Sequence, residues 1–445
     1  MEEKNIVILG GGESGIGAAL LAKKEGLNVF VSDSGMLKKR YRDQLLNNDI
    51  PFEEAGHSDR IFQTQLVIKS PGIPDTIAVL DYYKKNHIEI ISEIEFAFRY
   101  TQSYIIGITG SNGKTTTSLL LYHILKTAGR DVVIAGNVGD SFAKAVATTP
   151  ASIYVLELSS FQLDGITSFK PDIAIITNIT PDHLNRYNYQ FKNYVASKMR
   201  ITKNQGINDH LIICMDDEAT TKAIQQTKPA ASIIGFSTQT DCNAASYIKK
   251  NNLFIHIKQE ELIMTLEELA LQGRHNVYNS MAAGVASRLI DIRKDTIKQC
   301  LSDFQSIPHR LEQISIVHGV TYINDSKATN VNSAWYALES QNTPIVWIAG
   351  GIDKGNDYSK LYELVKQRVK VLICLGTDNR KLVEAFIDDV KIIKNANSMT
   401  EAVNMAYHAS TPGDTVLLSP ACASFDLFDN YEDRGDQFIA AVKTL

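Results

Sequence analysis

The stretch GITGSNGKTTTSLLLYHIL, which begins at Gly107, constrains the fold of this chain more than any other. An apolar run at 104–108 precedes its glycines, and apolar residues recur at helical spacing from Leu121 to Ala128. This order predicts a strand, a phosphate-binding loop and a helix. Gly110 and Gly113 would let the backbone turn tightly, so that its N–H groups face an anion. The stretch therefore predicts a site for nucleotide phosphates.

Two polar residues after these glycines support that prediction. Lys114 can reach the outer phosphates of a nucleotide, and Thr115 can offer its hydroxyl to Mg²⁺. The match to the usual phosphate-loop motif is not strict. The first glycine of that motif would fall at position 108, where this chain has Ile108, and the chain has Gly107 one residue earlier. A glycine turn without a ligand is the alternative.

A second glycine-rich turn lies near the start of the chain. Gly10, Gly12 and Gly15 fit G-x-G-x-x-G between an apolar run and a helical pattern, and Asp33 ends the next apolar run. Alone, this pattern would predict a nicotinamide-dependent oxidoreductase. Such an enzyme has no need of the second phosphate loop, so we predict a site for some nucleotide diphosphate. Glycines that serve only packing are the alternative.

Apolar runs and helical patterns alternate to the end of the chain, which is typical of parallel sheets covered on both faces. The run YIKKNNLFIHI at 247–257 predicts a hairpin. At 445 residues the chain is long enough for three domains of about 150 residues each. We predict an α/β protein of three domains, each with a mainly parallel sheet and flanking helices. These are a Rossmann-like domain at 1–93, a phosphate-loop domain at 94–306 and a Rossmann-like domain at 307–445.

Charge and cysteine content narrow the class of protein. A formal net charge of −5 provides no general attraction for nucleic acid. The cysteines are scattered and odd in number, which favours reduced thiols in a cytoplasm over disulfides or a zinc site. They are Cys214, Cys242, Cys300, Cys374 and Cys422. The first residues lack the pattern of a signal peptide, and no apolar run approaches membrane-spanning length. We expect a cytoplasmic, monomeric enzyme without membrane insertion.

Polar residues follow several apolar runs, at the strand ends where parallel sheets bind ligands. Glu157 follows IYVL and is a candidate Mg²⁺ ligand. Asn178, Asp182 and His183 follow DIAIIT in the same manner, with turn formation or helix capping as the alternative. For Lys198, which lies in an amphipathic helical pattern, residue type alone predicts a solvated surface lysine.

A set of motifs occurs in order over almost the whole chain: GSNGKTT, LELSSFQL, NITPDHLNRY, SKMR, GRHNVYNSMAA, PHRLE, INDSKATN and LLSPACASFDLFDNYEDRG. Together they resemble the ATP-dependent Mur ligases of bacterial peptidoglycan synthesis, and SSFQL and SPACASFD resemble the branch that adds D-glutamate. The resemblance implies that the chain joins D-glutamate to UDP-N-acetylmuramoyl-L-alanine. Within the family, addition of L-alanine or a diamino acid is the alternative. A phosphate-loop nucleotide switch is a more remote one.

The resemblance also implies roles for individual residues. The UDP substrate would contact Ser14, Asp33, Ser70, Gly72, Asn137 and Ser159. ATP would contact Gly110, Ser111, Asn112, Gly113, Lys114, Thr115, Thr116, Asn276, Asn279, His309, Arg310, Asp325 and Lys327. D-Glutamate would contact Thr329, Lys354, Ser424, Phe425 and Tyr431. Two Mg²⁺ ions would bind at Thr115, Glu157, His183 and Lys198, the last as a carbamate formed with CO₂.

Other interpretations stay open for some of these residues. Helix capping is the alternative for Asn276 and Asn279, and a solvated lysine for Lys354. The four predicted ATP contacts from His309 to Lys327 could instead form surface ion pairs. Tyr431 stands where this family usually has phenylalanine, and GGGESG departs in detail from the commoner first glycine loop.

These roles imply a reaction in two steps. The L-alanyl carboxylate would attack the γ-phosphate of ATP and become an acyl phosphate, and the amine of D-glutamate would then displace phosphate through a tetrahedral intermediate. The predicted catalytic residues are Lys114, Glu157, His183 and Lys198. Lys114 and the metals would offset the repulsion between the carboxylate and ATP. Three reactants on three domains imply that the last domain closes and excludes water.

Overall fold

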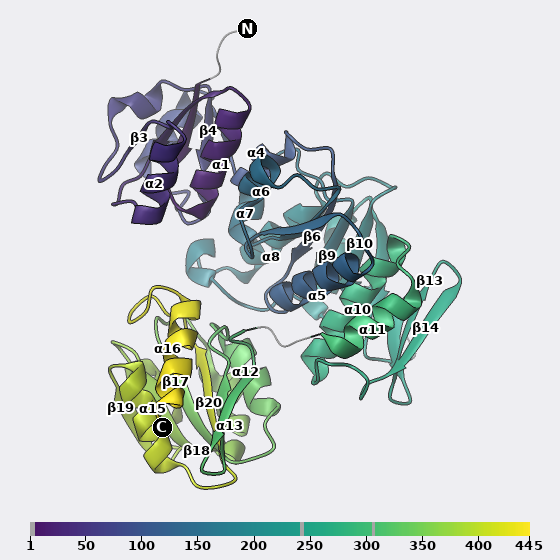
Figure 1. Cartoon of the computed structure of the whole chain (residues 1–445), viewed down its shortest axis with the longest axis vertical. Helices are drawn as coiled ribbons and strands as arrows, with labels where there is room; N and C mark the ends of the chain where they lie inside the picture. The colour runs from purple at the N-terminus through teal and green to yellow at the C-terminus, as the bar shows by residue number, and fades with distance from the viewer. Residues whose placement is uncertain (1–4, 241–243, 305–307) are drawn as a thin grey trace. The chain divides into compact units, whose positions relative to one another are not determined.

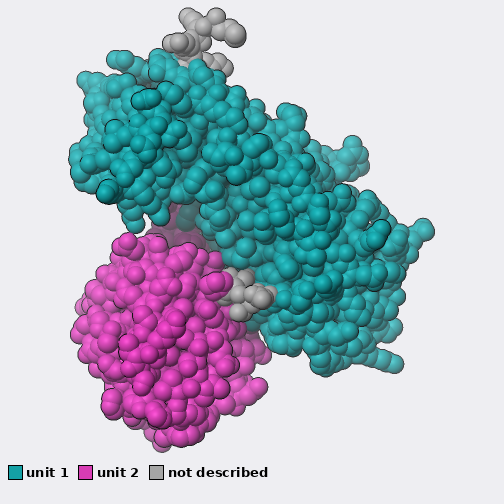
Figure 2. All heavy atoms as spheres, viewed as in Figure 1, with its two compact units in different colours: residues 1–179, 190–304 teal, residues 180–189, 305–445 magenta. Residues whose placement is uncertain are grey.

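The computed structural model describes residues 5–240, 244–304 and 308–445. Cys242 and the predicted boundary at 306/307 lie outside the described residues. The chain forms three α/β domains on three sheets in which parallel pairing predominates, which confirms the predicted fold class. The predicted domain boundaries remain predictions. Contacts divide the chain into two compact units (Figure 2). The first unit comprises residues 1–179 and 190–304, and the second comprises residues 180–189 and 305–445.

The first sheet is wholly parallel, in the order β3-β2-β1-β4-β5. Its strands are β1 (Asn5–Leu9), β2 (Asn28–Ser32), β3 (Phe52–Glu53), β4 (Leu66–Lys69) and β5 (Glu89–Ile91). The helical segments are α1 (Glu13–Lys24), α2 (Lys39–Asn47), η1 (Asp59–Phe62), α3 (Ala78–Lys85) and α4 (Glu93–Phe98). Every interior residue of β1 is buried, as the continuous apolar run requires.

The second sheet has nine strands in the order β14-β13-β12-β11-β10-β9-β6-β8-β7. These are β6 (Tyr104–Thr109), β7 (Val132–Gly136), β8 (Ile153–Glu157), β9 (Ile173–Ile176), β10 (His210–Cys214), β11 (Ser232–Phe236), β12 (Ser246–Lys249), β13 (Asn252–Ile257) and β14 (Glu260–Thr265). The pairing is parallel from β7 to β12, whereas β12, β13 and β14 pair antiparallel. The hairpin predicted at 247–257 is therefore confirmed.

Helices α5, α10 and α11 pack on this sheet, and their apolar residues form one core with it (Figure 1). The helical segments of this domain are α5 (Lys114–Thr127), α6 (Phe142–Thr148), α7 (Ser160–Asp164), α8 (Phe191–Met199), η3 (Arg200–Thr202), α9 (Glu218–Thr227), α10 (Arg274–Leu289) and α11 (Lys294–Asp303). Helix α5 follows the phosphate loop directly, so that its N-terminal N–H groups are available to an anion.

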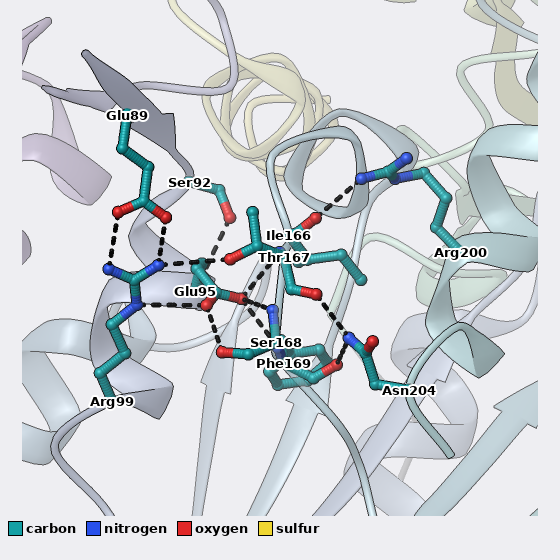
Figure 3. Close-up of polar contacts among 10 residues, drawn as sticks. All are labelled: Glu89, Ser92, Glu95, Arg99, Ile166, Thr167, Ser168, Phe169, Arg200 and Asn204. Atoms are coloured by element: carbon teal, nitrogen blue, oxygen red, sulfur yellow. Dashed lines mark hydrogen bonds and ion pairs between the residues drawn. The ribbon is translucent and has the colours of Figure 1, made fainter. Parts of the chain in front are cut away.

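Within this unit, a buried carboxylate joins α4 to the segment before β9 (Figure 3). Glu95 accepts the backbone N–H groups of Thr167, Ser168 and Phe169 at 2.9, 3.0 and 2.7 Å. It also accepts the Ser168 hydroxyl at 2.5 Å and Arg99 Nε at 3.2 Å. The side chain of Glu95 has no exposed surface, so these donors replace its lost hydration.

The third sheet, in the second unit, has the order β15-β16-β20-β17-β18-β19, with only β15 antiparallel among the described strands. Its strands are β15 (Glu312–Val317), β16 (Val320–Asn324), β17 (Ile345–Gly350), β18 (Val369–Leu375), β19 (Ile393–Ala396) and β20 (Thr415–Ala421). The helical segments are η2 (Leu184–Tyr187), α12 (Val331–Glu339), η4 (Tyr358–Leu361), α13 (Tyr362–Arg368), α14 (Arg380–Phe386), α15 (Met399–Ala409) and α16 (Tyr431–Lys443).

This sheet is covered on both faces. In β17, Trp347 packs into the core with α12, α13 and α14, whereas Val346 and Ile348 pack into the core with α15 and α16. Alternate residues of a strand point to opposite faces, so two cores explain an unbroken apolar run. Within the described ranges, no helix combines the length and the apolar character needed to span a membrane.

Candidate active site

The first glycine-rich turn lines a pocket of about 510 Å³ where β1, β2 and β4 end. Gly10, Asp33 and Gly72 line this pocket. Asp33 accepts the N–H of Gly11 at 2.7 Å, and the Ser70 hydroxyl donates to the carbonyl of Gly10 at 3.1 Å. The structure therefore brings the predicted residues of two loops to one pocket, at the strand ends where such sheets bind ligands.

The third glycine of the motif, Gly15, is required for steric reasons. A Cβ on Gly15, in the first turn of α1, would overlap the carbonyl oxygen of Gly10. Ser14 lies in the same turn and is half-buried. His57 also lines the pocket, and its Nδ1 lies 2.6 Å from Oγ of Ser32. No motif in the sequence indicated this residue.

The second glycine loop is held in shape by the strand beside it. Asn178, just after β9, accepts the N–H of Ser111 through its carbonyl at 2.8 Å and the N–H of Asn112 through Oδ1 at 3.0 Å. Gly110 and Gly113 have φ values of +147° and +84°, which other residues rarely adopt. Asn178 therefore has a structural part in the loop rather than the cap considered from sequence.

Asn279 and Asn276 lie on α10 beside this loop. A Cβ on Gly113 would overlap Oδ1 of Asn279, and Thr117 donates to the same oxygen at 3.3 Å. Asn276 donates to the carbonyl of Gln272 at 2.9 Å. Neither side chain caps the N-terminus of α10, whose N-cap is a glycine, so the capping alternative is wrong.

Two lysines converge on the carbonyl of Gly110. Lys114 Nζ donates to it at 2.8 Å, and Lys198 Nζ donates to it at 2.7 Å. Lys198 is 1% exposed, so the solvated lysine predicted from residue type is wrong. The ring of Tyr194, one turn earlier on α8, lies 4.7 Å from Lys198 Nζ, and its hydroxyl lies 3.2 Å from that of Ser111. Sequence spacing could have drawn attention to Tyr194, since it is four residues before Lys198.

Glu157 is buried at the end of β8 and has one unused carboxylate oxygen. Asn137 donates to its Oε1 at 2.8 Å, whereas Oε2 has no hydrogen-bond partner among the described residues. A buried carboxylate oxygen without a donor is costly unless a cation binds it. Thr115 is buried in the first turn of α5 after the phosphate loop. A carboxylate and a hydroxyl are ligands that Mg²⁺ prefers, so these residues fit the predicted metal.

Two other predicted residues have local roles. Ser159 is the N-cap of α7 and forms a capping box with Gln162, whose N–H it accepts at 3.3 Å. This explains the SSFQL motif in part by helix capping. Thr116 is buried in α5, and its hydroxyl has no partner among the described residues.

In the second unit, the predicted ATP contacts surround the end of β16. His309 Nδ1 lies 2.9 Å from Nδ2 of Asn324, and Asp325 accepts the N–H of Leu311 at 3.2 Å and the Ser419 hydroxyl at 2.9 Å. Burial raises the pKa of Asp325 to about 7, although Arg310 and these hydrogen bonds oppose the rise.

Lys327 joins this group to a predicted D-glutamate contact. Its Nζ donates to the hydroxyl of Tyr431 at 3.0 Å and lies 4.8 Å from the centre of that ring. Buried Arg434, which sequence analysis missed, donates to the carbonyl of Ser326 at 2.8 Å and to that of Cys422 at 3.2 Å. One guanidinium therefore holds the two loops that carry the NDSK and SPACASFD motifs.

The segment 180–189 belongs to this unit and supplies the ion-pair partner of Lys354. Lys354 Nζ lies 2.9 Å from Oδ1 of Asp182, with side chains 12% and 9% exposed. The solvated lysine considered for Lys354 is therefore wrong. Asn330 donates to the other oxygen of Asp182 at 3.3 Å, and Nε2 of His183 lies 3.7 Å from it.

Backbone pairing of Ile352 with Ala423 places the loop of Lys354 beside that of Ser424. Ser424 is buried, whereas Phe425 is 70% exposed. Thr329 is half-buried and lies next to Asn330, which contacts Asp182. Four of the five predicted D-glutamate residues thus lie on loops that follow β16, β17 and β20, and the fifth, Tyr431, is the first residue of α16.

Comparison with known proteins gives the relationship. The family model described as MurD N-terminal domain matches residues 5–78, Mur ligase middle domain matches 108–287, and Mur ligase, glutamate ligase domain matches 309–422. The UDP-N-acetylmuramoylalanine--D-glutamate ligase of Christiangramia forsetii is 51% identical over 443 residues, which cover 99% of this chain and 100% of that protein.

Two solved structures share the fold. A pseudomurein peptide ligase type C from Methanothermus fervidus aligns with a TM-score of 0.64 at 21% identity, over 99% of both chains. The MurF ligase from Thermotoga maritima, solved in complex with ADP, aligns with a TM-score of 0.63 at 16% identity, over 94% of both chains. From the three domain matches and the full-length relative, this chain belongs to the Mur ligase family.

Proposed function

We propose that this protein is an ATP-dependent amide ligase that adds D-glutamate to UDP-N-acetylmuramoyl-L-alanine and releases ADP and phosphate in the cytoplasm. The observation that carries the proposal is the 51% identity, over the full length of both chains, with a ligase of that name. The MurD N-terminal match supports D-glutamate over L-alanine or a diamino acid as the added residue.

The binding sites follow from the loops described above. The UDP moiety binds in the pocket of Gly10, Asp33 and Gly72, because N–H groups and a helix N-terminus at the strand ends suit a diphosphate. The phosphates of ATP bind at the loop that Asn178 braces. In the structure Lys114 Nζ donates to the carbonyl groups of Gly110 and Ser111, and it would exchange these contacts for phosphate oxygens.

The chain's own residues prepare the first step. Glu157 and Thr115 would hold Mg²⁺, together with His183 and carbamylated Lys198, and the metal would supply charge that offsets the repulsion between carboxylate and γ-phosphate. Lys198 is buried beside the phosphate loop, where its Nζ contacts the carbonyl of Gly110, and its neutral amine is the form that would react with CO₂. Asn137 fixes one oxygen of Glu157, which leaves the other to face the metal.

The second unit would bind the nucleophile. D-Glutamate carries two carboxylates, so its site needs cations and hydroxyl donors. Lys354 meets that need, but it already forms a partly buried ion pair with Asp182. We propose that a substrate carboxylate replaces Asp182 as the partner of Lys354. Segment 180–189 also carries His183, so this exchange would link D-glutamate binding to the metal ligand.

The test measures ADP release with UDP-N-acetylmuramoyl-L-alanine, ATP, Mg²⁺ and a panel of amino acids, each omitted in turn. We expect release only with D-glutamate and the UDP substrate together. Turnover with L-lysine or diaminopimelate but not with D-glutamate would overturn the substrate assignment. Hydroxylamine should trap the acyl phosphate as a hydroxamate, and ADP release without any hydroxamate would contradict the mechanism.

A further inference from the structure

Three side chains of the middle domain that can bind metal lie together, away from the phosphate loop. His123 lies on α5, nine residues or about 14 Å along the helix from Lys114. Cys300 and Asp303 lie on α11, three residues apart and so on one face of the helix. Their ligand atoms all lie within 4.8 Å of one another, and His123 Nε2 is 3.2 Å from Oδ1 of Asp303.

We propose that His123, Cys300 and Asp303 form a binding site for a zinc-class divalent cation, with water as a fourth ligand. Imidazole, thiolate and carboxylate are ligands of Zn²⁺ and Co²⁺, and a thiolate selects against Mg²⁺. This cation is therefore of a different class from the one expected at Glu157. The proposal does not rest on the proposed function.

The surroundings fit a cation. The sulfur of Cys300 is buried, whereas the side chains of His123 and Asp303 are 37% and 50% exposed, so an ion has a path of entry and room for water. Ligand atoms around a tetrahedral Zn²⁺ lie about 3.5 Å apart, so small rotations of the two exposed side chains would close the site. The ring of Phe304 packs edge to face against that of His123, with the ring centres 5.6 Å apart, and this contact limits the rotation of the imidazole.

Charge in the cluster also favours a cation. Asp303 is the last residue of α11, where the negative end of the helix dipole disfavours a carboxylate. A bound cation would offset this effect, because it would pair with the carboxylate.

The consequence is a link between the helix of the phosphate loop and α11. The two helices already pack together, and a shared ion would fasten them at their C-terminal halves. Sequence spacing gave no sign of this site, because its ligands come from segments 177 residues apart.

The test is titration of the untagged full chain, under reducing conditions and excess Mg²⁺, with Co²⁺. A thiolate ligand gives a near-ultraviolet charge-transfer band that oxygen and nitrogen ligands do not give. We expect this band to saturate with one equivalent of Co²⁺ and to disappear when Zn²⁺ is added. Absence of the band, or its loss on raising Mg²⁺ further, would overturn the proposal.

Three variants test whether the Co²⁺ charge-transfer band comes from the cluster of His123, Cys300 and Asp303. Cys300→Ser should abolish it, whereas Cys214→Ser, a matched change at another buried thiol of the same domain, should preserve it. His123→Gln changes a half-exposed side chain and should weaken Co²⁺ binding more than about tenfold, because loss of an outer-sphere partner alone costs about that much. A band that survives in Cys300→Ser, or unchanged affinity in His123→Gln, would refute the assignment even if one variant folds poorly.

Discussion

Replacement of Glu95 by glutamine tests how much one buried carboxylate contributes to the first unit. The carboxylate accepts three backbone N–H groups, a hydroxyl and Arg99 (Figure 3). Burial alone would raise the pKa of Glu95, but the hydrogen bonds from Ser168, Thr167 and Phe169 outweigh it and lower the pKa from 4.5 to about 2. The carboxylate therefore stabilises the fold because it is charged.

The contribution of Glu95 to the free energy of unfolding follows from the lowering of its pKa. A depressed pKa contributes stability that is present above about pH 4.5 and is lost as the pH falls toward 2. At about 1.4 kcal/mol per pKa unit, the contribution of Glu95 at pH 7 is about 3 kcal/mol. Glutamine keeps one acceptor oxygen and turns an amide toward N–H donors, so we expect Glu95→Gln to cost about 3 kcal/mol.

Hydrogen exchange at 165–170, read by mass spectrometry, measures this loss where it occurs and needs no two-state unfolding of the whole chain. The matched control is Glu89→Gln, because Glu89 binds the same guanidinium of Arg99 at 2.6 Å with a side chain that is 45% exposed. An exposed pair contributes less than about 1 kcal/mol. Equal protection losses in the two variants, or a Glu95→Gln loss below about 1 kcal/mol, would refute the argument from burial.

Three further predictions concern the site and its pH response. Lys198→Ala should remove most ligase activity, and formate or another short carboxylate should partly restore it; wild-type turnover in this variant would exclude Lys198 from the mechanism. Gly15→Ala, whose Cβ would overlap the Gly10 carbonyl oxygen, should raise the KM for the UDP substrate more than about tenfold and leave the KM for ATP nearly unchanged. Burial raises the pKa of Glu93 from 4.5 to about 8, although the N–H of Ala143 opposes the rise. As pH rises, Glu93 loses its proton near pH 4.5 in the unfolded chain but only near pH 8 in the folded chain. Thermal stability should therefore fall as pH rises from about 5 to 8. Glu93→Gln should flatten this slope, as measured by calorimetry.

The fold class could be predicted because each long strand carries its own signal. Strand β17 is an apolar run in which Trp347 and its neighbours face different cores, and such a run needs helices on both faces of a parallel sheet. The shorter strands β3 and β5 gave no comparable signal, because two or three residues show no periodicity. The phosphate loop was also predictable, since its chemistry depends on glycine spacing within one short segment.

The parts of the site that sequence could not predict depend on contacts between distant segments. Lys198 is polar and lies in an amphipathic helix, and only the packing of Tyr194 and the carbonyl of Gly110 shows that it is buried. Likewise, Lys354 and Asp182 are 172 residues apart, so no local pattern could reveal their ion pair. The resemblance to a known family indicated both lysines, but it did not indicate their partners.

Burial alone does not reveal what a carboxylate does, and three glutamates of the first unit show why. Glu95 has donors to both oxygens, which favours the charged form and leaves no room for a cation. Glu93 has a single backbone donor and keeps its proton to about pH 8, so it acts as a neutral group. Glu157 accepts a hydrogen bond at one carboxylate oxygen only, from Asn137. We propose that a bound cation is the partner of its other oxygen. The count of donors separates Glu95 from the other two glutamates, but Glu93 and Glu157 each have one oxygen with a donor and one without a partner among the described residues. What distinguishes Glu157 as the proposed metal ligand is its place at the end of β8, in the same sheet as the strand that leads into the phosphate loop.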